Sequence, residues 1–157
     1  MKTLYVMCGI PASGKSTLSK KIASDYGITR FSLDEMGYIR QHRIIPYIID
    51  ALENGDSVVA DSLYTIKEWR KELLEAVKEI ECKRILVYMD IPLNVCIQRN
   101  RNRDNPLPDY CIENEFEHFE NPSLDEGWDK IIHVKEYITH ERIYEDNIEC
   151  CNGMGTW

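Results

Sequence analysis

The sequence contains 157 residues, of which 43% are hydrophobic and 29% are charged, so it fits one globular domain and excludes a disordered chain. No apolar run approaches the ~20 residues that a membrane-spanning helix requires, and we expect no membrane association. The formal net charge of -8 argues against general adhesion to nucleic acid, which depends on Lys and Arg neutralising phosphates, but it leaves room for local basic patches.

The first predicted elements are a strand, a glycine-rich loop and a helix. Residues 4–8 are almost all apolar, as expected of a buried central strand. Residues 15 to about 26 carry Leu18 and Ile22 on one helical face, and Gly27 is a suitable stop. Because the apolar N-terminus runs directly into the loop, we interpret it as a core strand and not as a signal peptide, and we expect a cytoplasmic protein.

Residues 9–16, Gly-Ile-Pro-Ala-Ser-Gly-Lys-Ser, match the complete Walker A pattern of a phosphate-binding loop. Glycine lets successive backbone N–H groups point at phosphate oxygens, and the N-terminus of the following helix adds its dipole. We expect Lys15 to reach the β- and γ-phosphates of ATP and Ser16 to ligate Mg²⁺. The predicted ATP-binding residues are Gly9, Ala12, Ser13, Gly14, Lys15, Ser16, Thr17 and, from a later segment, Arg99.

The rest of the sequence continues to alternate strands and helices. Residues 29–33 and 57–60 are predicted strands, and residues 36–54 are predicted to be mostly helical with Pro46 as a break or kink. A capping box, Thr65-x-x-Glu68, is expected to open a helix that ends near residue 81. The remaining expected elements are a strand over 84–89, a helix from 93 to about 102, a helix capped by Asp109 and a strand over 131–134.

This alternation predicts an α/β fold, a P-loop NTPase-type parallel sheet of about five strands with helices on both faces and a small arginine-bearing lid. We expect residues 1–157 to form a single P-loop kinase domain. Beyond about residue 137 the pattern predicts no element, and residues 152–157 are expected to form a loose tail.

Three acidic residues, Asp34, Asp61 and Asp90, follow predicted strands, at the sheet edge where ligands bind in open α/β folds, and we expect a structural turn at Asp90. Asp34 can take the proton of an attacking hydroxyl as a general base, and we favour this role over that of an N-cap for the next segment. Asp61 suits a magnesium-linked role or an anchor for a nearby Arg or Ser, and capping the turn at Ser62 is an equal alternative.

Three arginines are candidates for phosphate contacts. Arg99 and Arg103 are four residues apart, share a face of the predicted helix and precede a proline-rich break. A mobile lid carrying both would neutralise charge on the transferring phosphoryl group, and we favour this over a solvated charged face. Arg40 follows Asp34 on the segment expected to line the acceptor pocket, where it would bind an acceptor phosphate.

Several motifs together resemble the 5′-kinase domain of polynucleotide kinases, over roughly residues 2–135. They are the loop with Thr17, Ser-Leu-Asp at 32–34, Val-Val-Ala-Asp-Ser at 58–62, Asp-Ile-Pro at 90–92 and the arginine segment at 99–103. Residues 108–134 also resemble the same region of O-phosphoseryl-tRNA kinases. The resemblance implies a general base at Asp34, a lid arginine on the transferred phosphoryl group at Arg103, a holder of the acceptor phosphate at Arg40 and a support of the acceptor site at Asp61.

The expected function is transfer of the γ-phosphoryl group of ATP, with Mg²⁺, to a hydroxyl, and the preferred acceptor is the 5′-OH end of DNA or RNA. Two alternatives stay open. One is a small-molecule or nucleoside kinase, which the acidic charge favours somewhat. The other is a non-kinase nucleotide-binding ATPase module, against which Asp34 and the lid arginines argue, because a simple binder needs neither.

Overall fold

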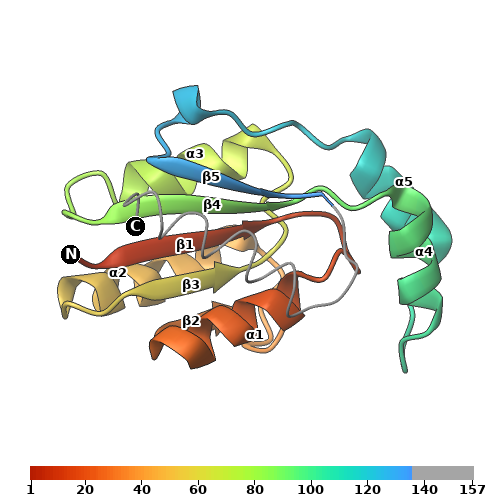
Figure 1. The fold of residues 1–157 in the computed structure, drawn as a ribbon, viewed down its shortest axis with the longest axis horizontal. Helices are drawn as coiled ribbons and strands as arrows, with labels where there is room; N and C mark the ends of the chain where they lie inside the picture. Colours follow the sequence, from red (N-terminus) through yellow and green to blue (C-terminus); the bar gives the residue numbers. More distant parts are fainter. Residues whose placement is uncertain (136–157) are drawn as a thin grey trace.

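The computed structural model describes residues 1–135 of the protein, in which five strands alternate with helices (Figure 1). No helix within these residues is both long and apolar enough to cross a membrane. The elements are β1 (Thr3–Cys8), α1 (Lys15–Tyr26), β2 (Thr29–Ser32), the short 3-10 helix η1 (Gln41–Ile44), α2 (Ile45–Glu53), β3 (Val58–Asp61), α3 (Lys67–Ala76), β4 (Lys83–Met89), α4 (Leu93–Arg101), α5 (Asp109–Glu117), the short 3-10 helix η2 (Leu124–Glu126) and β5 (Lys130–Val134).

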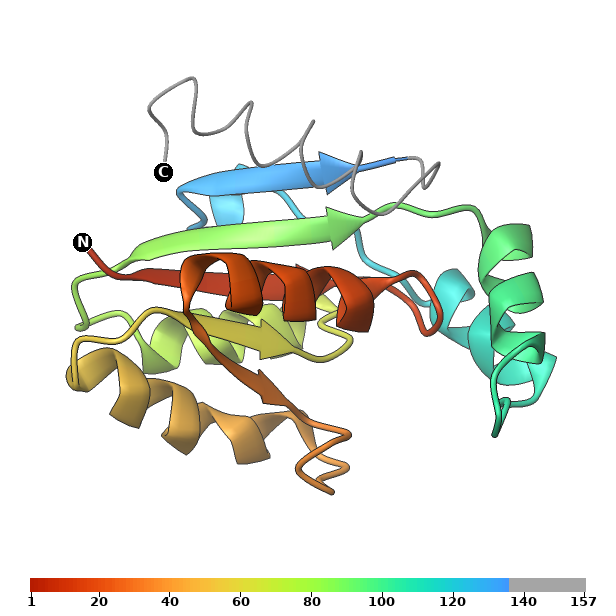
Figure 2. The ribbon, with the colours of Figure 1, turned by 60° about the horizontal axis from the view of Figure 1, so that its bottom comes forward.

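The sheet has the strand order β2-β3-β1-β4-β5, and every neighbouring pair is parallel. The central strand β1 pairs on both sides, with Tyr5 opposite Val59 and Ile85. Because neighbouring residues of a strand point to opposite faces, Leu4 and Val6 enter the core beneath α2 and α3, whereas Tyr5 and Met7 enter the core beneath α1. The predicted parallel α/β fold is therefore confirmed, with helices on both faces (Figure 2).

The two helices α4 and α5 lie beyond the carboxyl ends of the strands and form the lid predicted from the arginine segment (Figure 1). Asn100 is fully buried at their junction, where its side-chain amide donates to the Leu107 carbonyl at 2.6 Å and its amide oxygen accepts from the Leu107 N–H at 3.1 Å. The turn between the helices is thus closed on both sides by one side chain, which fixes the start of α5.

The predicted helix over 36–54 is wrong in its first half. After β2 the chain turns, because the Met36 N–H donates to the Ser32 carbonyl and the Gly37 N–H to the Asp34 carbonyl, both at 3.0 Å. Gly37 adopts a φ of 77°, which ends any helical path there. Helix α2 begins only at Ile45, and Pro46 lies in its first turn, where a missing N–H costs nothing, so it produces no kink.

Both predicted helix caps are also wrong. Helix α3 begins at Lys67 and ends at Ala76, short of residue 81, and its first N–H, that of Lys67, donates to the Glu120 carboxylate at 3.1 Å and not to Thr65. The Thr65 hydroxyl instead donates to Glu115 on α5, at 3.1 Å. Asp109 is the first residue of α5 and pairs with Arg101 on α4, so it joins the two lid helices instead of capping one.

A buried arginine holds the segment after α5 against the fold. Arg70 on α3 has no exposed surface, and its guanidinium binds Glu126 at 2.8 Å and the carbonyl of Tyr64 at 2.8 Å. Glu126 also completes a capping box with Ser123 at η2. This pair fixes the path from α5 to β5, and the tail expected at 152–157 lies outside the described residues.

Candidate active site

The loop between β1 and α1 is shaped by close contacts that only glycine permits. A Cβ placed on Gly9 would lie 2.7 Å from the Ser13 hydroxyl oxygen and 3.0 Å from Cβ of Met89. The Gly9 N–H donates to the Leu63 carbonyl at 3.0 Å, which ties the loop to the segment after β3. Farther along, Ala12 and Gly14 have φ values of 63° and 97°, so the backbone curls as a phosphate-binding loop does.

Lys15 begins helix α1 and is buried, with 8% of its surface exposed. Its ammonium group donates to the Ile10 carbonyl at 3.0 Å. Burial lowers the pKa of Lys15, and the nearby Asp61 carboxylate opposes that shift by favouring the charged form. Ser16 and Thr17 follow on the first turn of the helix, where both are exposed to solvent.

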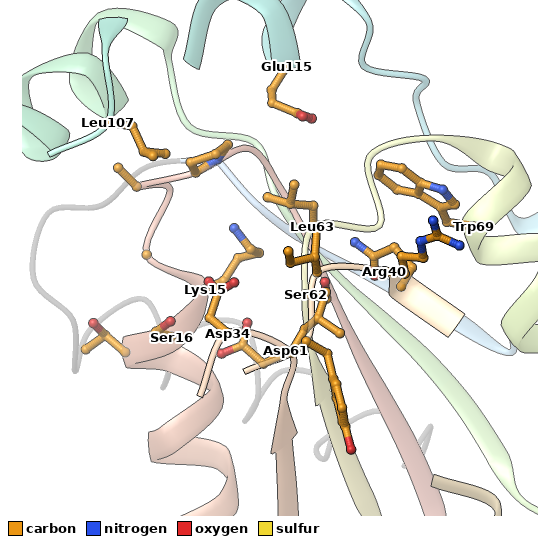
Figure 3. Close-up of a pocket in the computed structure, with 18 of the residues that line it drawn as sticks. Lys15, Ser16, Asp34, Arg40, Asp61, Ser62, Leu63, Trp69, Leu107 and Glu115 are labelled. Carbon is orange, nitrogen blue, oxygen red and sulfur yellow. The ribbon is translucent and has the colours of Figure 1, made fainter. Parts of the chain in front are cut away.

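One cleft of about 890 Å³ opens at the carboxyl ends of β1, β2 and β3, beneath the lid (Figure 3). It brings together most of the residues predicted as a site, although they come from five different segments. Gly9 and Ser13 do not line it, because both are buried on the inner side of the loop. The predicted residues that do line it are Ala12, Gly14, Lys15, Ser16, Thr17, Asp34, Arg40, Asp61, Arg99 and Arg103.

Asp34 occupies the turn after β2, and its exposed side chain lines the cleft together with Lys15 (Figure 3). The alternative of an N-cap is wrong, because a turn follows Asp34 and the next helical residue is Gln41. The adjacent Glu35 binds Arg30 at 2.7 Å, and this ion pair holds the pKa of Glu35 below its usual value. The turn that carries Asp34 is thereby attached to strand β2.

Asp61 ends β3 and is almost completely buried at the cleft floor. One of its carboxylate oxygens accepts hydrogen bonds from the Ser19 hydroxyl at 2.7 Å and from the Arg30 guanidinium at 2.6 Å. Asp61 is therefore an anchor for an arginine and a serine, which is one of the three roles that its position in the sequence predicted. The same Arg30 reaches Glu35, so it joins the floor of the cleft to the turn of Asp34.

Both lid arginines line the cleft, and the helix ends before Arg103 as predicted, but the helical face that they were expected to share does not form. Helix α4 ends at Arg101, so Arg103 follows the helix and does not share a helical face with Arg99. The Arg103 N–H donates to the Asn100 carbonyl in a turn, and Arg103 lines the cleft together with Arg99. Arg40, exposed at the start of η1, lines the cleft beside Trp69 (Figure 3).

Several other residues that were not predicted as site residues also line the cleft. Trp69 on α3 is half-buried and faces both the core and the cleft (Figure 3). The sequence could have indicated this position, because Trp69 lies in the first turn of a helix that follows a strand, and the first turns of such helices lie at the carboxyl edge of the sheet. The other unpredicted residues on the cleft wall include Tyr38, His42, Leu63, Glu72 and Glu115.

The chain has the P-loop kinase fold. Its features are a parallel sheet with this strand order, a glycine-dependent loop that carries a buried lysine, and a helical lid with arginines. The family model described as "Chromatin associated protein KTI12" matches residues 2–151. The chain therefore belongs to the KTI12 family.

Two curated relatives share the chain's sequence at moderate identity. The L-seryl-tRNA(Sec) kinase of Methanococcus maripaludis is 27% identical over 169 residues, which cover 93% of this chain and 65% of the relative. The bifunctional polynucleotide phosphatase/kinase of Schizosaccharomyces pombe is 24% identical over 136 residues, which cover 83% of this chain and 33% of the relative. The chain thus spans less than two thirds of the length of each of these relatives.

A solved structure of Kti12 from Chaetomium thermophilum, in complex with ADP-AlF3, superposes on the chain with a TM-score of 0.78. The identity is 17%, and the match covers 95% of this chain and 97% of the other. At that identity the likeness establishes the fold alone. The curled loop and the buried Lys15 at the cleft wall suit the binding of phosphate groups.

Proposed function

We propose that the protein is an ATP-dependent phosphotransferase that moves the γ-phosphoryl group of ATP to the 5′-hydroxyl end of a nucleic acid. The observation that carries this proposal is the single cleft lined by Lys15, Asp34 and Arg103, a phosphate-binding cation, a solvent-facing carboxylate and a lid arginine. The two curated relatives are named as kinases of a tRNA and of polynucleotides, which supports an acceptor of this class.

In the proposed reaction, the curled loop and Lys15 bind the phosphates of ATP. Ser16, exposed on the first turn of α1 and lining the cleft, would hold the magnesium ion of Mg·ATP, because Mg²⁺ usually takes one or two protein groups besides phosphate oxygens and water. Bound magnesium neutralises charge on the β- and γ-phosphates.

Asp34 accepts the proton of the acceptor hydroxyl as its oxygen attacks the γ-phosphorus, and the bond to the β-phosphate oxygen breaks to release ADP. Arg99 and Arg103 stabilise the negative charge on the phosphoryl group in transit. Asp34 then releases the proton to solvent, to which its exposed side chain has access.

Arg40 supplies the preference for a nucleic acid end in this account. It lines the same cleft as Asp34, so a phosphate next to the reacting hydroxyl would lie within the range of its guanidinium. A nucleoside 3′-monophosphate, which carries such a phosphate, should therefore react much better than the bare nucleoside.

The test measures transfer from labelled ATP to a nucleoside, to its 3′-monophosphate and to a 5′-hydroxyl oligonucleotide. The wild-type protein should phosphorylate the latter two and leave the nucleoside almost untouched. Arg40→Ala should erase that preference, and Arg40→Lys, which keeps the charge and loses the paired N–H donors, should keep part of it. Equal rates on nucleoside and nucleoside 3′-monophosphate would instead favour the small-molecule kinase.

A nucleotide-hydrolysing module is the second candidate function, and one observation favours it. The side chain of Asp34 is exposed, so water can reach the position that the acceptor hydroxyl would occupy. The family member from Chaetomium thermophilum has a structure with ADP-AlF3, which is also consistent with attack on the γ-phosphate by water. This alternative would be established if labelled inorganic phosphate were released at the same rate with and without a nucleic acid acceptor, and if no labelled acceptor were formed.

A further inference from the structure

The cleft continues in two directions that differ in charge. Toward α5 it joins a second hollow of about 660 Å³, with which it shares Pro11, Leu63, Leu107 and Glu115. Three glutamates, Glu113, Glu115 and Glu117, line this hollow, and none of its lining residues in the described part of the chain is Lys or Arg. A phosphate chain leaving the site in this direction would pass three carboxylates with no cation to offset them.

Toward β2 the surface is aromatic and basic. Tyr38 lines the cleft, and the Arg43 guanidinium lies over its ring, 4.7 Å from the ring centroid. The hydroxyls of Tyr38 and Tyr47 are 2.9 Å apart, with ring centroids separated by 6.2 Å. We call the half-buried Tyr38 and the exposed Ile39, Arg43 and Tyr47 together the tyrosine–arginine surface.

The residues of this surface are more exposed than apolar side chains in a core would be. Ile39 is 94% exposed and Tyr47 is 42% exposed, whereas the inner side of Tyr47 meets Phe31 at a ring-centroid distance of 5.9 Å. Each tyrosine is thus supported from beneath and held by its neighbour's hydroxyl, which fixes an aromatic platform at low cost in side-chain entropy.

We infer that single-stranded nucleic acid continuing from the acceptor end leaves the cleft over the tyrosine–arginine surface, with bases stacked on Tyr47 and a backbone phosphate against Arg43. This inference rests on the proposed function, because it extends the acceptor from one nucleotide to a strand. An aromatic platform beside a cation is the arrangement that binds single strands without sequence preference. The acidic lining on the α5 side makes the opposite exit unfavourable.

The experiment measures the Kd of 3′-fluorescein-labelled 5′-hydroxyl oligonucleotides by anisotropy, so its readout does not depend on catalysis. Tyr47→Ala should weaken binding of an octanucleotide by about 5-fold or more, the loss expected from one stacked base, and should weaken a dinucleotide less. Tyr47→Phe keeps the ring and should bind nearly as the wild type does. Tyr110→Ala is the matched control, because Tyr110 is 70% exposed and lines the acidic hollow.

The charge of the surface is tested by salt dependence. Arg43→Gln should flatten the plot of log Kd against log salt by ~0.7 for the octanucleotide, the value for one phosphate on a single strand. Lys78→Gln removes one charge at a position that lines neither hollow, and it should leave the slope unchanged. Equal losses for Tyr47→Ala and Tyr110→Ala, or an unchanged slope for Arg43→Gln, would overturn the inference.

Transfer assays on the same variants separate this inference from the proposed function. If the wild-type protein phosphorylates no acceptor and the octanucleotide still depends on Tyr47, the strand path is upheld and the kinase proposal fails. If the protein phosphorylates a nucleoside 3′-monophosphate and binds the octanucleotide no more tightly than the dinucleotide, the kinase proposal is upheld and the strand path fails.

Discussion

Replacing Lys15 by methionine should raise the stability of the nucleotide-free protein while removing its response to ATP. The ammonium group of Lys15 is buried, and its hydrogen bond goes to one backbone carbonyl, that of Ile10. The lowered pKa of Lys15, caused first by burial, means that the fold disfavours the charged form. Methionine has a similar shape and carries no charge to bury.

The size of the effect follows from two opposing terms. Keeping an ammonium group out of water costs several kcal/mol, and the hydrogen bond to Ile10 returns about 1.5–3 kcal/mol because its donor is charged. The Asp61 carboxylate returns a further part. We therefore expect Lys15→Met to stabilise the nucleotide-free protein by about 1–3 kcal/mol, which raises Tm by about 2–10 °C in a chain of this length.

The assay is thermal unfolding with and without magnesium and ATP. At ATP about 100-fold above its Kd, the wild-type protein should gain about 2.7 kcal/mol, and Lys15→Met should gain almost nothing. Lys20→Met is the control, since Lys20 is an exposed lysine of the same helix and its exposed ion pair with Glu35 contributes little. A lower Tm for Lys15→Met without ATP would show that the buried ammonium group does not destabilise the fold, and an unchanged gain with ATP would show that Lys15 does not bind its phosphates.

Three further substitutions test the framework around the cleft. Gly9→Ala should cost about 1–3 kcal/mol in urea unfolding and reduce ATP binding, because its Cβ would overlap the loop it supports. Although burial alone would raise the pKa of Glu126, hydrogen bonds led by that of Arg70 lower it. Ionised Glu126 therefore stabilises the fold above its ordinary pKa of 4.5, and this contribution is lost as pH falls through the lowered value. Glu126→Gln should accordingly be about 3 kcal/mol less stable at pH 7, and the deficit should shrink below pH 4.5. Arg30→Met should lower kcat with little change in KM for ATP, because it releases the turn of the proposed base from Asp61, and Arg30→Lys should restore part of kcat.

The parts of the fold that depend on local pattern could be predicted from the sequence. The apolar run before Gly9 and the spacing to Lys15 are continuous in the chain, so one short segment specified the strand, the loop and the start of the helix. Asp34 and Asp61 could be assigned to one sheet edge because parallel strands share a direction. The position of the cleft at the carboxyl edge of the sheet could therefore be predicted without knowing any contact between side chains.

The parts that depend on contacts between distant residues could not be predicted. Thr65 and Glu68 satisfy the sequence pattern of a capping box, but Thr65 finds a partner on α5, 50 residues away in the chain. An arginine on a helix is usually exposed to solvent. Arg70 is buried instead, because its guanidinium pairs with Glu126, 56 residues later in the chain. The link from Arg30 to Asp61 was missed for the same reason, since it joins neighbouring strands whose pairing the sequence pattern alone does not specify.

The central claim is that Asp34 acts as the general base of a phosphoryl transfer. Its most direct test is the rate of labelled phosphoryl transfer to a nucleoside 3′-monophosphate by Asp34→Asn, measured beside ATP affinity and thermal stability. The account predicts a loss in kcat of ~10²- to 10⁴-fold with unchanged ATP affinity and an unchanged Tm, because the carboxylate is exposed and contributes to the reaction and not to the fold. A variant that keeps the wild-type kcat would contradict it.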